Sequence, residues 1–408
     1  MAKAPKLGDL SLILVGFLLG LPAPGLIFSF ISTPAPPFLT SASPASAASA
    51  LVLPAPRARR GYALSAAAHH FCDALASAQP PESPLPQWQI VGGDGWAAAA
   101  GFEEPACHWT KMWHPGVPMQ PLNVCTHDPA QDGVISTFLH TYHFWGSPDD
   151  YNLLLAMGPC TRERPYMLDI GANLGVYTIL GASRGCRALA FEPLSQNILR
   201  LRASLASMGL QDRAMLFKHA VGKGFQPVKI GFRPFNPGAS ALGVDGAVTE
   251  RVEQITIDGL LLGERPPRFP EDESGASSPD IVGRHINFIK IDTEGYDVAV
   301  VDGMLRTLIE GRPPHILIEF GPNDAAGTAG CDPARFVELM YAAGYRMYEG
   351  AKAHPLRALI DVELPFALSG KGRRVFEAWF LHDDAAREWM NMGLLQRPGV
   401  GGGVEFAE

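Results

Sequence analysis

The segment YMLDIGANLG, residues 166–175, is the clearest indication of the fold class in this sequence. Its first half is a short apolar run, and this run passes directly into a turn that contains Gly171 and Gly175. A buried strand followed by a glycine-rich turn begins a βα unit, and open α/β sheets bind ligands where such strands end. Glycine also allows the backbone to approach a ligand where a Cβ would collide. We therefore expect the turn to line a ligand site.

Apolar runs and helical stretches alternate along the chain after this turn. Continuous apolar strands between helices are typical of a parallel sheet that is covered on both faces. The pattern predicts a doubly wound α/β domain over residues 121–395. The expected strands are 187–192, 214–221, 228–232, 252–257, 286–292, 315–320 and 375–383, and the expected helices are 195–208, 298–309 and 333–343.

Glu192 follows the first of these later runs and provides a carboxylate on the neighbouring strand. Such a carboxylate can accept hydrogen bonds from the 2′- and 3′-hydroxyls of a ribose, as in dinucleotide-binding proteins. The GxGxxG fingerprint requires a second glycine two residues after Gly171, and Asn173 stands there instead, so pyrophosphate binding is disfavoured. A nucleoside-type ligand is predicted; the alternative is a tight βα connection without a ligand.

Three further carboxylates belong to later strands. Asp292 and Glu294 follow INFIKI, and Glu319 lies in HILIEF. Strand alternation would place Asp292 and Glu294 on one side, and close carboxylates raise the pKa of one of them, which suits a proton acceptor. In the alternative interpretation, Asp292 caps a helix and Glu294 accepts backbone N–H bonds. Glu319 would be the partner of these two acids or would bind the substrate that gives up the proton. The stretch FNPGASALG (235–243) is either a loop that binds this acceptor substrate or a plain turn.

These motifs together resemble the FkbM family of methyltransferases. The likeness spans about residues 120–322, although the upstream part departs from the family pattern at HFWGSPDD, residues 143–150. The stretches that carry the resemblance are VCTHDPAQDGVIS (124–136), LDIGANLGVYT (168–178), FEPLSQN (191–197), FIKIDTEGYDVAVVDGM (288–304) and PHILIEF (314–320).

The resemblance implies a class I methyltransferase fold, which is Rossmann-like with a mostly parallel seven-stranded sheet, and S-adenosylmethionine as cofactor. It also implies a role for each matching residue. Around the methionine moiety it places Asp169, Gly171, Asn173 and Gly175, on the ribose Glu192, and beside the adenine Ala220 and Val221.

The predicted function is methyl transfer to a hydroxyl of a sugar, a glycan or a similar small acceptor, for which the acceptor must lose its proton. Two alternatives are a catalytically silent scaffold with the same fold and a nicotinamide-dependent reductase. The intact motifs disfavour the first and the missing glycine disfavours the second. A net charge of -8 and a pI near 5.8 disfavour a nucleic-acid partner.

The N-terminal region precedes the domain. Residues 10–32 contain no charged side chain and are long enough to cross a bilayer. After a tail of residues 1–9 that carries Lys3 and Lys6, they predict a signal anchor with the domain in the lumen of the secretory pathway. A cleaved signal peptide or an organelle-targeting peptide remains an alternative.

The remaining segments and the cysteines complete the expectations. We expect a disordered stem at 33–60, a weakly patterned collar at 61–120, a disordered insertion at 264–280 and a disordered tail at 396–408. The six cysteines form no CxxC pair, which favours buried thiols over one or two disulfides in a lumen. Scattered histidines between residues 69 and 143 match no ligand motif, so no metal site is predicted.

Overall fold

The computed structural model describes one compact part of the chain. All described residues lie within the unit that spans residues 66–408. The predicted tail, anchor and stem (1–60) and the C-terminal tail (396–408) lie outside them. No helix among the described residues is long and apolar enough to cross a membrane. The described residues are 72, 105–113, 119–145, 158, 160–233, 236–242, 248–263, 267, 269, 283–321, 330–349, 357–358 and 376–391.

A sheet of eight strands in the order β13-β12-β14-β11-β10-β3-β4-β5 forms the centre of this unit. β3 lies where the chain order reverses, so its carboxyl end is the topological switch point at which α/β sheets bind ligands. The strands are β3 (Tyr166–Ile170), β4 (Arg187–Phe191), β5 (Ala214–Phe217), β10 (Ile286–Ile291), β11 (His315–Phe320), β12 (Tyr345–Glu349), β13 (Arg357–Ala358) and β14 (Phe376–His382).

The strand directions confirm a mostly parallel α/β sheet but not a seven-stranded one. Neighbouring strands from β5 to β11 are parallel, whereas β14 is antiparallel to both β11 and β12. The described residues include an eighth strand, the two-residue β13, which pairs antiparallel with β12. A two-residue strand leaves no period in the sequence, and the direction of β14 depends on how the chain returns to the sheet.

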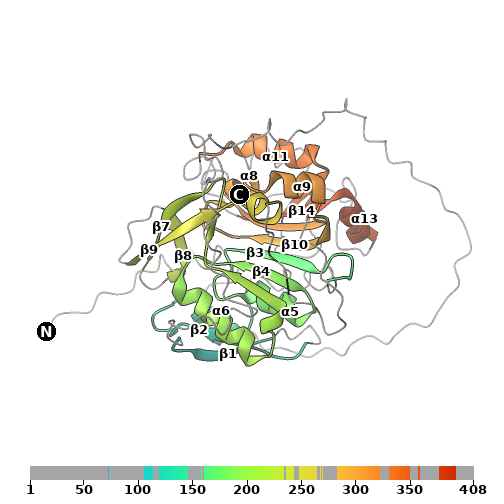
Figure 1. The fold of residues 1–408 in the computed structure, drawn as a ribbon. Helices are drawn as coiled ribbons and strands as arrows, with labels where there is room; N and C mark the ends of the chain where they lie inside the picture. Colours follow the sequence, from blue (N-terminus) through green and yellow to red (C-terminus); the bar gives the residue numbers. More distant parts are fainter. Residues whose placement is uncertain are drawn as a thin grey trace, which may run out of the picture. The chain divides into compact units, whose positions relative to one another are not determined.

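Helices cover both faces of the sheet, as the doubly wound pattern predicts. Side chains of β3 alternate between two cores: Leu168 and Ile170 pack on one face and Met167 on the other. Figure 1 shows α8, α9 and α11 on one side of β10, β3 and β4, with α5 and α6 on the other. The helices are α3 (Ile135–Tyr142), α5 (Val176–Ser183), α6 (Ser195–Ser207), α7 (Ile257–Leu261), α8 (Asp297–Asp302), α9 (Leu305–Gly311), α11 (Pro333–Ala342) and α13 (Asp383–Asn391).

The helix expected at 298–309 is divided into α8 and α9 around Gly303. A Cβ at Gly303 would lie 2.0 Å from the carbonyl oxygen of Gly222, so the backbones of two segments touch at this point. The spacing of apolar residues continues across the break, because Val298 and Val301 of α8 and Leu305 and Leu308 of α9 belong to the same buried core. A single periodic run therefore covers two helices.

A second sheet contains β6 (Ala220–Val221), β9 (Val248–Ile255), β7 (Gln226–Arg233) and β8 (Asn236–Leu242), in that order. The run expected as one strand at 214–221 is divided between the two sheets. Its first part forms β5 in the central sheet, and its last two residues form β6, which pairs with β9. The stretch interpreted as an acceptor loop or a turn lies largely in β8, so the expected loop or turn conformation is wrong, and a role in binding the acceptor stays a prediction. Proline and glycine are tolerated there because β8 is an edge strand.

The predicted collar and insertion are partly ordered. β1 (His108–Met112) pairs antiparallel with β2 (Leu122–Thr126), so a hairpin crosses the boundary expected at residue 120. Within the predicted insertion, Phe269 is buried and stacks on Tyr166 with ring centroids 5.8 Å apart. At that position the expected disorder is wrong; of the other insertion residues, only position 267 is described.

All six cysteines are paired, which makes the favoured interpretation as buried thiols wrong. The disulfides are Cys72–Cys331, Cys107–Cys125 and Cys160–Cys186. One of them joins residues separated by 259 positions in the chain, and the others join residues separated by 18 and 26. Such pairings depend on the fold and not on any local spacing, which is why the sequence did not predict them.

Candidate functional site

The glycine-rich turn after β3 is held against other parts of the protein. Gly171 has φ +80°, and a Cβ there would lie 1.8 Å from the backbone oxygen of Asp292. Gly175 has φ +81°, and its Cβ would lie 2.1 Å from a methyl group of Leu201 on α6. Both glycines are therefore required by the protein's own packing. The contact at Gly171 brings the turn and the loop after β10 together.

Glu192 lies beside this turn at the end of β4, as predicted. One carboxylate oxygen, Oε2, accepts the N–H of Asn173 at 2.8 Å, and Oε1 accepts the N–H of Leu194 at 2.9 Å. The residue is only 4% exposed, and burial raises the pKa of its carboxyl to about 7, against the opposing effect of these hydrogen bonds. A carboxylate has lone pairs beyond these two, so it can still accept from a ribose diol.

Asp169 faces the interior of the protein. Its Oδ2 accepts both the backbone N–H of Thr178 at 2.9 Å and the hydroxyl of Thr178 at 2.6 Å. This arrangement ties β3 to the first turn of α5. Burial raises the pKa of Asp169 to about 6. The described contacts are thus structural, and a direct contact between Asp169 and the methionine moiety stays a prediction.

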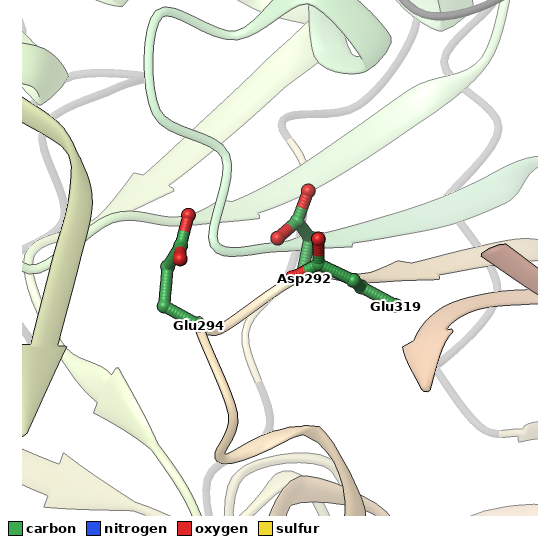
Figure 2. A group of neighbouring side chains, drawn as sticks. All are labelled: Asp292, Glu294 and Glu319. Atoms are coloured by element: carbon green, nitrogen blue, oxygen red, sulfur yellow. The ribbon is translucent and has the colours of Figure 1, made fainter. Parts of the chain in front are cut away.

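Asp292, Glu294 and Glu319 meet at the carboxyl ends of β10 and β11. Each offers one carboxylate oxygen, and these oxygens lie within 4.8 Å of one another. Figure 2 shows the three carboxyl groups on the same side of the loop that follows β10. Strand alternation is not the cause, because β10 ends at Ile291 and Glu294 adopts a left-handed conformation with φ 55°. The loop conformation brings the side chains together.

A different acid, Asp297, holds this loop. Its carboxylate accepts the backbone N–H groups of Thr293 at 2.8 Å and Gly295 at 3.1 Å. Residue 296 occupies the N-cap of α8 without a side-chain cap. The alternative interpretation of Asp292 as the helix cap is therefore wrong. Burial, followed by the charge of Asp292, raises the pKa of Asp297 to about 6.

Lys290 is the residue of this cluster that the sequence analysis missed. It is 2% exposed, its Nζ lies 3.3 Å from Oδ2 of Asp292, and it stands 5.3 Å from the ring centroid of Tyr177. Burial lowers its pKa, but the charges of Asp292, Glu377 and Glu319 outweigh burial and hold the pKa above the ordinary value. A lysine within the apolar run INFIKI was the available signal, since lysine is rarely buried without a partner.

The charges around the cluster favour the protonated form of Glu319. The negative charge of Asp292, then burial, then the charges of Glu294 and Asp297 raise the pKa of Glu319 well above its usual range. The protonated form of Glu319 is thus favoured, whereas Asp292 faces the ammonium of Lys290. A proton-accepting role falls to Asp292 or Glu294. The same oxygen spacing could also hold a divalent cation, which the sequence analysis did not anticipate.

The two residues predicted beside the adenine are both buried in β6. Val221 packs in the main core, and Ala220 packs in a smaller cluster with Leu194 and Val252. His219 precedes them, and burial followed by the charge of Lys218 lowers the pKa of its imidazole to about 4. Contact of Ala220 or Val221 with adenine stays a prediction.

Several solved structures resemble the chain at low sequence identity. Methyltransferase FkbM from Methylobacillus flagellatus KT is 16% identical, with a TM-score of 0.30, over 54% of this chain and 44% of that one. A putative O-methyltransferase from Klebsiella pneumoniae is 13% identical, with a TM-score of 0.28, over 62% and 98%. WbdD is 12% identical, with a TM-score of 0.31, over 58% and 40%. The chain thus spans less than half the length of the FkbM and WbdD chains.

The family comparison covers the site described above. A search of curated proteins finds no significant match. The model of the family described as "Methyltransferase FkbM domain" matches residues 169–347, a range that contains the glycine turn, Glu192 and all three clustered carboxylates. The resemblance seen in the motifs is confirmed over residues 169–347, which are similar to the FkbM methyltransferase domain.

Proposed function

We propose that this protein is an S-adenosylmethionine-dependent methyltransferase that transfers a methyl group to a hydroxyl. The observation that carries the proposal is the contact between the two halves of the site. A Cβ on Gly171, in the turn beside Glu192, would collide with the backbone of Asp292 in the acidic cluster. A cofactor held by Glu192 would thus lie near carboxylates that can take a proton.

The residues present fit this cofactor. The Glu192 carboxylate would accept hydrogen bonds from the ribose hydroxyls, and the glycine turn would border the rest of the molecule. When bound, S-adenosylmethionine supplies an electrophilic methyl group on a sulfonium sulfur. Transfer of that methyl group to the acceptor oxygen would leave S-adenosylhomocysteine, and a carboxylate of the protein would take the hydroxyl proton.

The cluster can supply that carboxylate. Asp292 or Glu294 would accept the proton, while Lys290 lies 3.3 Å from Asp292 and the neighbouring acids favour the protonated form of Glu319. Glu319 in its neutral form can also donate a hydrogen bond to the acceptor oxygen. General base catalysis of this kind contributes about 10²- to 10⁴-fold in rate.

Binding of S-adenosylmethionine is the first test of this function. Calorimetry on the full chain is expected to show saturable binding of S-adenosylmethionine, and NADH should bind more weakly because the GxGxxG fingerprint is missing. Tritiated methyl transfer into a hydroxyl-bearing extract then separates an enzyme from a silent scaffold. Tighter binding of NADH, or binding of S-adenosylmethionine without any transfer, would contradict the proposal.

We place the domain in the secretory lumen, with a sugar or glycan as the acceptor. Disulfides persist in oxidising compartments and are rare in the cytosol, and all six cysteines are paired here. The uncharged stretch at residues 10–32 supports a membrane anchor. Mass spectrometry of glycans from cells with and without the protein would identify the acceptor.

The expected location can be measured directly. The full chain should resist carbonate extraction, stay protected from added protease until detergent is present, and show no free thiol before reduction. A variant lacking residues 10–32 provides the control and should lose membrane association. Recovery of the full chain in the soluble fraction contradicts the anchor, and a mature N-terminus near residues 45–50 would favour a cleaved signal.

A further inference from the structure

A chain of buried polar contacts runs from β2 to Glu192. At the end of β2, Nε2 of His127 lies 2.8 Å from Oδ1 of Asn197, in the first turn of α6. On its other side, Nδ2 of Asn197 lies 3.4 Å from Oε1 of Glu192. His127 is 6% exposed and Asn197 is 1% exposed, so water does not replace these partners. The contacts connect a segment outside residues 169–347 with the candidate cofactor site.

The hydrogen-bonding capacity of the three groups sets the direction of each contact. An ionised carboxylate only accepts, so the amide nitrogen of Asn197 must face Glu192 and its carbonyl oxygen must face His127. His127 must then donate from Nε2. Burial lowers the pKa of His127, against the hydrogen bond to Asn197, which favours a neutral imidazole with its proton on Nε2. The imidazole thus prevents the Asn197 amide from turning its oxygen toward Glu192.

We propose that His127 and Asn197 are positioning residues for the cofactor carboxylate, so that the hairpin of β1 and β2 is a working part of the cofactor site. This inference rests on the proposed function of Glu192 in binding the ribose. Asn197 supplies a third donor to the carboxylate, after the N–H groups of Asn173 and Leu194. That donor favours the charged, accepting form of Glu192 and keeps its plane fixed.

Other contacts hold the hairpin along α6 without touching Glu192. The backbone N–H of Cys125 donates to Oγ of Ser204 at 2.8 Å, and Nε of Arg200 donates to the backbone oxygen of Thr126 at 3.2 Å. Cys125 is also bonded to Cys107. These contacts offer a matched control, because a change at Ser204 loosens the same interface at a distance from the carboxylate.

The effect of losing the donor has a defined sign. Asn197 is one of the groups that oppose the burial-induced rise in the pKa of Glu192, so its misorientation raises that pKa further. The charged groups around these contacts are Asp169 on β3, Arg200 on α6 and Asp132 before α3. None of them is altered by a change at His127. The affinity for S-adenosylmethionine should fall, and the pH at which half of it is lost should rise.

The test compares four variants of the full chain by calorimetry with S-adenosylmethionine across the pH range of the Glu192 titration. His127→Leu and Asn197→Leu should raise the Kd about three- to tenfold, the range for one hydrogen bond, and should shift the pH midpoint upward. His127→Gln should restore both values, because its terminal amide can donate at the place of Nε2. Ser204→Ala should lower the Tm and leave the pH midpoint unchanged.

Failure of this inference and failure of the proposed function give different results. If His127→Leu and Ser204→Ala raise the Kd by the same factor with an unchanged midpoint, His127 only packs the interface and the inference is wrong. The same holds if His127→Gln behaves like His127→Leu. If the wild-type protein binds no S-adenosylmethionine at any pH, the proposed function fails, which is a separate outcome.

Discussion

Glu294→Gln is expected to lower methyl transfer by about 10²- to 10⁴-fold, the usual cost of losing a general base. Glu294 is exposed, and glutamine keeps the size of its side chain while it removes the charge and the ability to take a proton. The affinity for S-adenosylmethionine and the Tm should stay near the wild-type values. Initial rates of tritiated methyl transfer measure the loss of activity, and calorimetry measures the affinity for S-adenosylmethionine.

Asp292→Asn should lower the rate over the same range but should also cost stability. Lys290 is buried 3.3 Å from Asp292, and removing one partner of a buried ion pair leaves an uncompensated charge. Because the Asp292 side chain is 33% exposed, the expected loss is smaller than for a fully buried pair, about 1–2 kcal/mol. A combined loss of rate and Tm at Asp292, against a loss of rate alone at Glu294, distinguishes the two roles.

The controls for these variants separate three mechanisms. Glu310→Gln alters an exposed glutamate whose partner is Arg306, one turn away on α9, and should leave rate and Tm unchanged. Turnover near wild type in both Glu294→Gln and Asp292→Asn would show that the acceptor proton leaves by another route. Loss of wild-type activity in EDTA, with recovery in Mg²⁺, would show instead that the carboxylates serve as metal ligands.

Glu192→Gln is expected to weaken binding of S-adenosylmethionine about 10- to 100-fold, since hydrogen bonds to a charged group are stronger than neutral ones. The amide keeps one acceptor oxygen but presents an NH₂ group to one of the backbone N–H donors at Asn173 and Leu194. Calorimetry measures the affinity, and circular dichroism checks that the fold is kept. Glu310→Gln again serves as the control.

The pH dependence of binding provides a second measurement on the same carboxylate. The pKa of Glu192 lies at about 7, raised mainly by burial. Only the ionised form accepts from both ribose hydroxyls, so the affinity should be full above this pKa and should fall as the pH drops through it. Burial raises the pKa of Asp169 to about 6, so any change in affinity that comes from protonation of Asp169 should occur at a lower pH than the change from Glu192. Glu192→Gln should remove the change near 7, and an unaltered pH profile would contradict the assignment.

Substitution of the glycines is a poor test of cofactor binding in this protein. A side chain at Gly171 would strike the backbone of Asp292, and one at Gly175 would strike Leu201. Either variant would disturb the fold whether or not a cofactor binds. The sequence analysis attributed the glycines to the close approach of a ligand, whereas the structure shows protein atoms at the place of each missing Cβ.

The α/β class, the position of the glycine turn and the acids at the strand ends could be predicted from the sequence. These features are local: an apolar strand, a turn residue and the next carboxylate lie within a few positions of one another. Because the carboxyl ends of parallel strands share one edge of the sheet, Asp292, Glu294 and Glu319 could be expected to meet. Glu192 could be expected beside the turn for the same reason.

The contact partners of these residues could be identified only in the folded chain. Lys290 and Asp297 contact residues only two to four positions away, but these contacts depend on burial and on the conformation of the loop. His127 contacts Asn197 across 70 positions of the chain. The pairing of Cys72 with Cys331 and the reversed direction of β14 are of the same kind. The periodicity of a sequence indicates which side of one helix or strand is buried. Contacts between different helices and strands depend instead on how the connections of the chain bring those elements together.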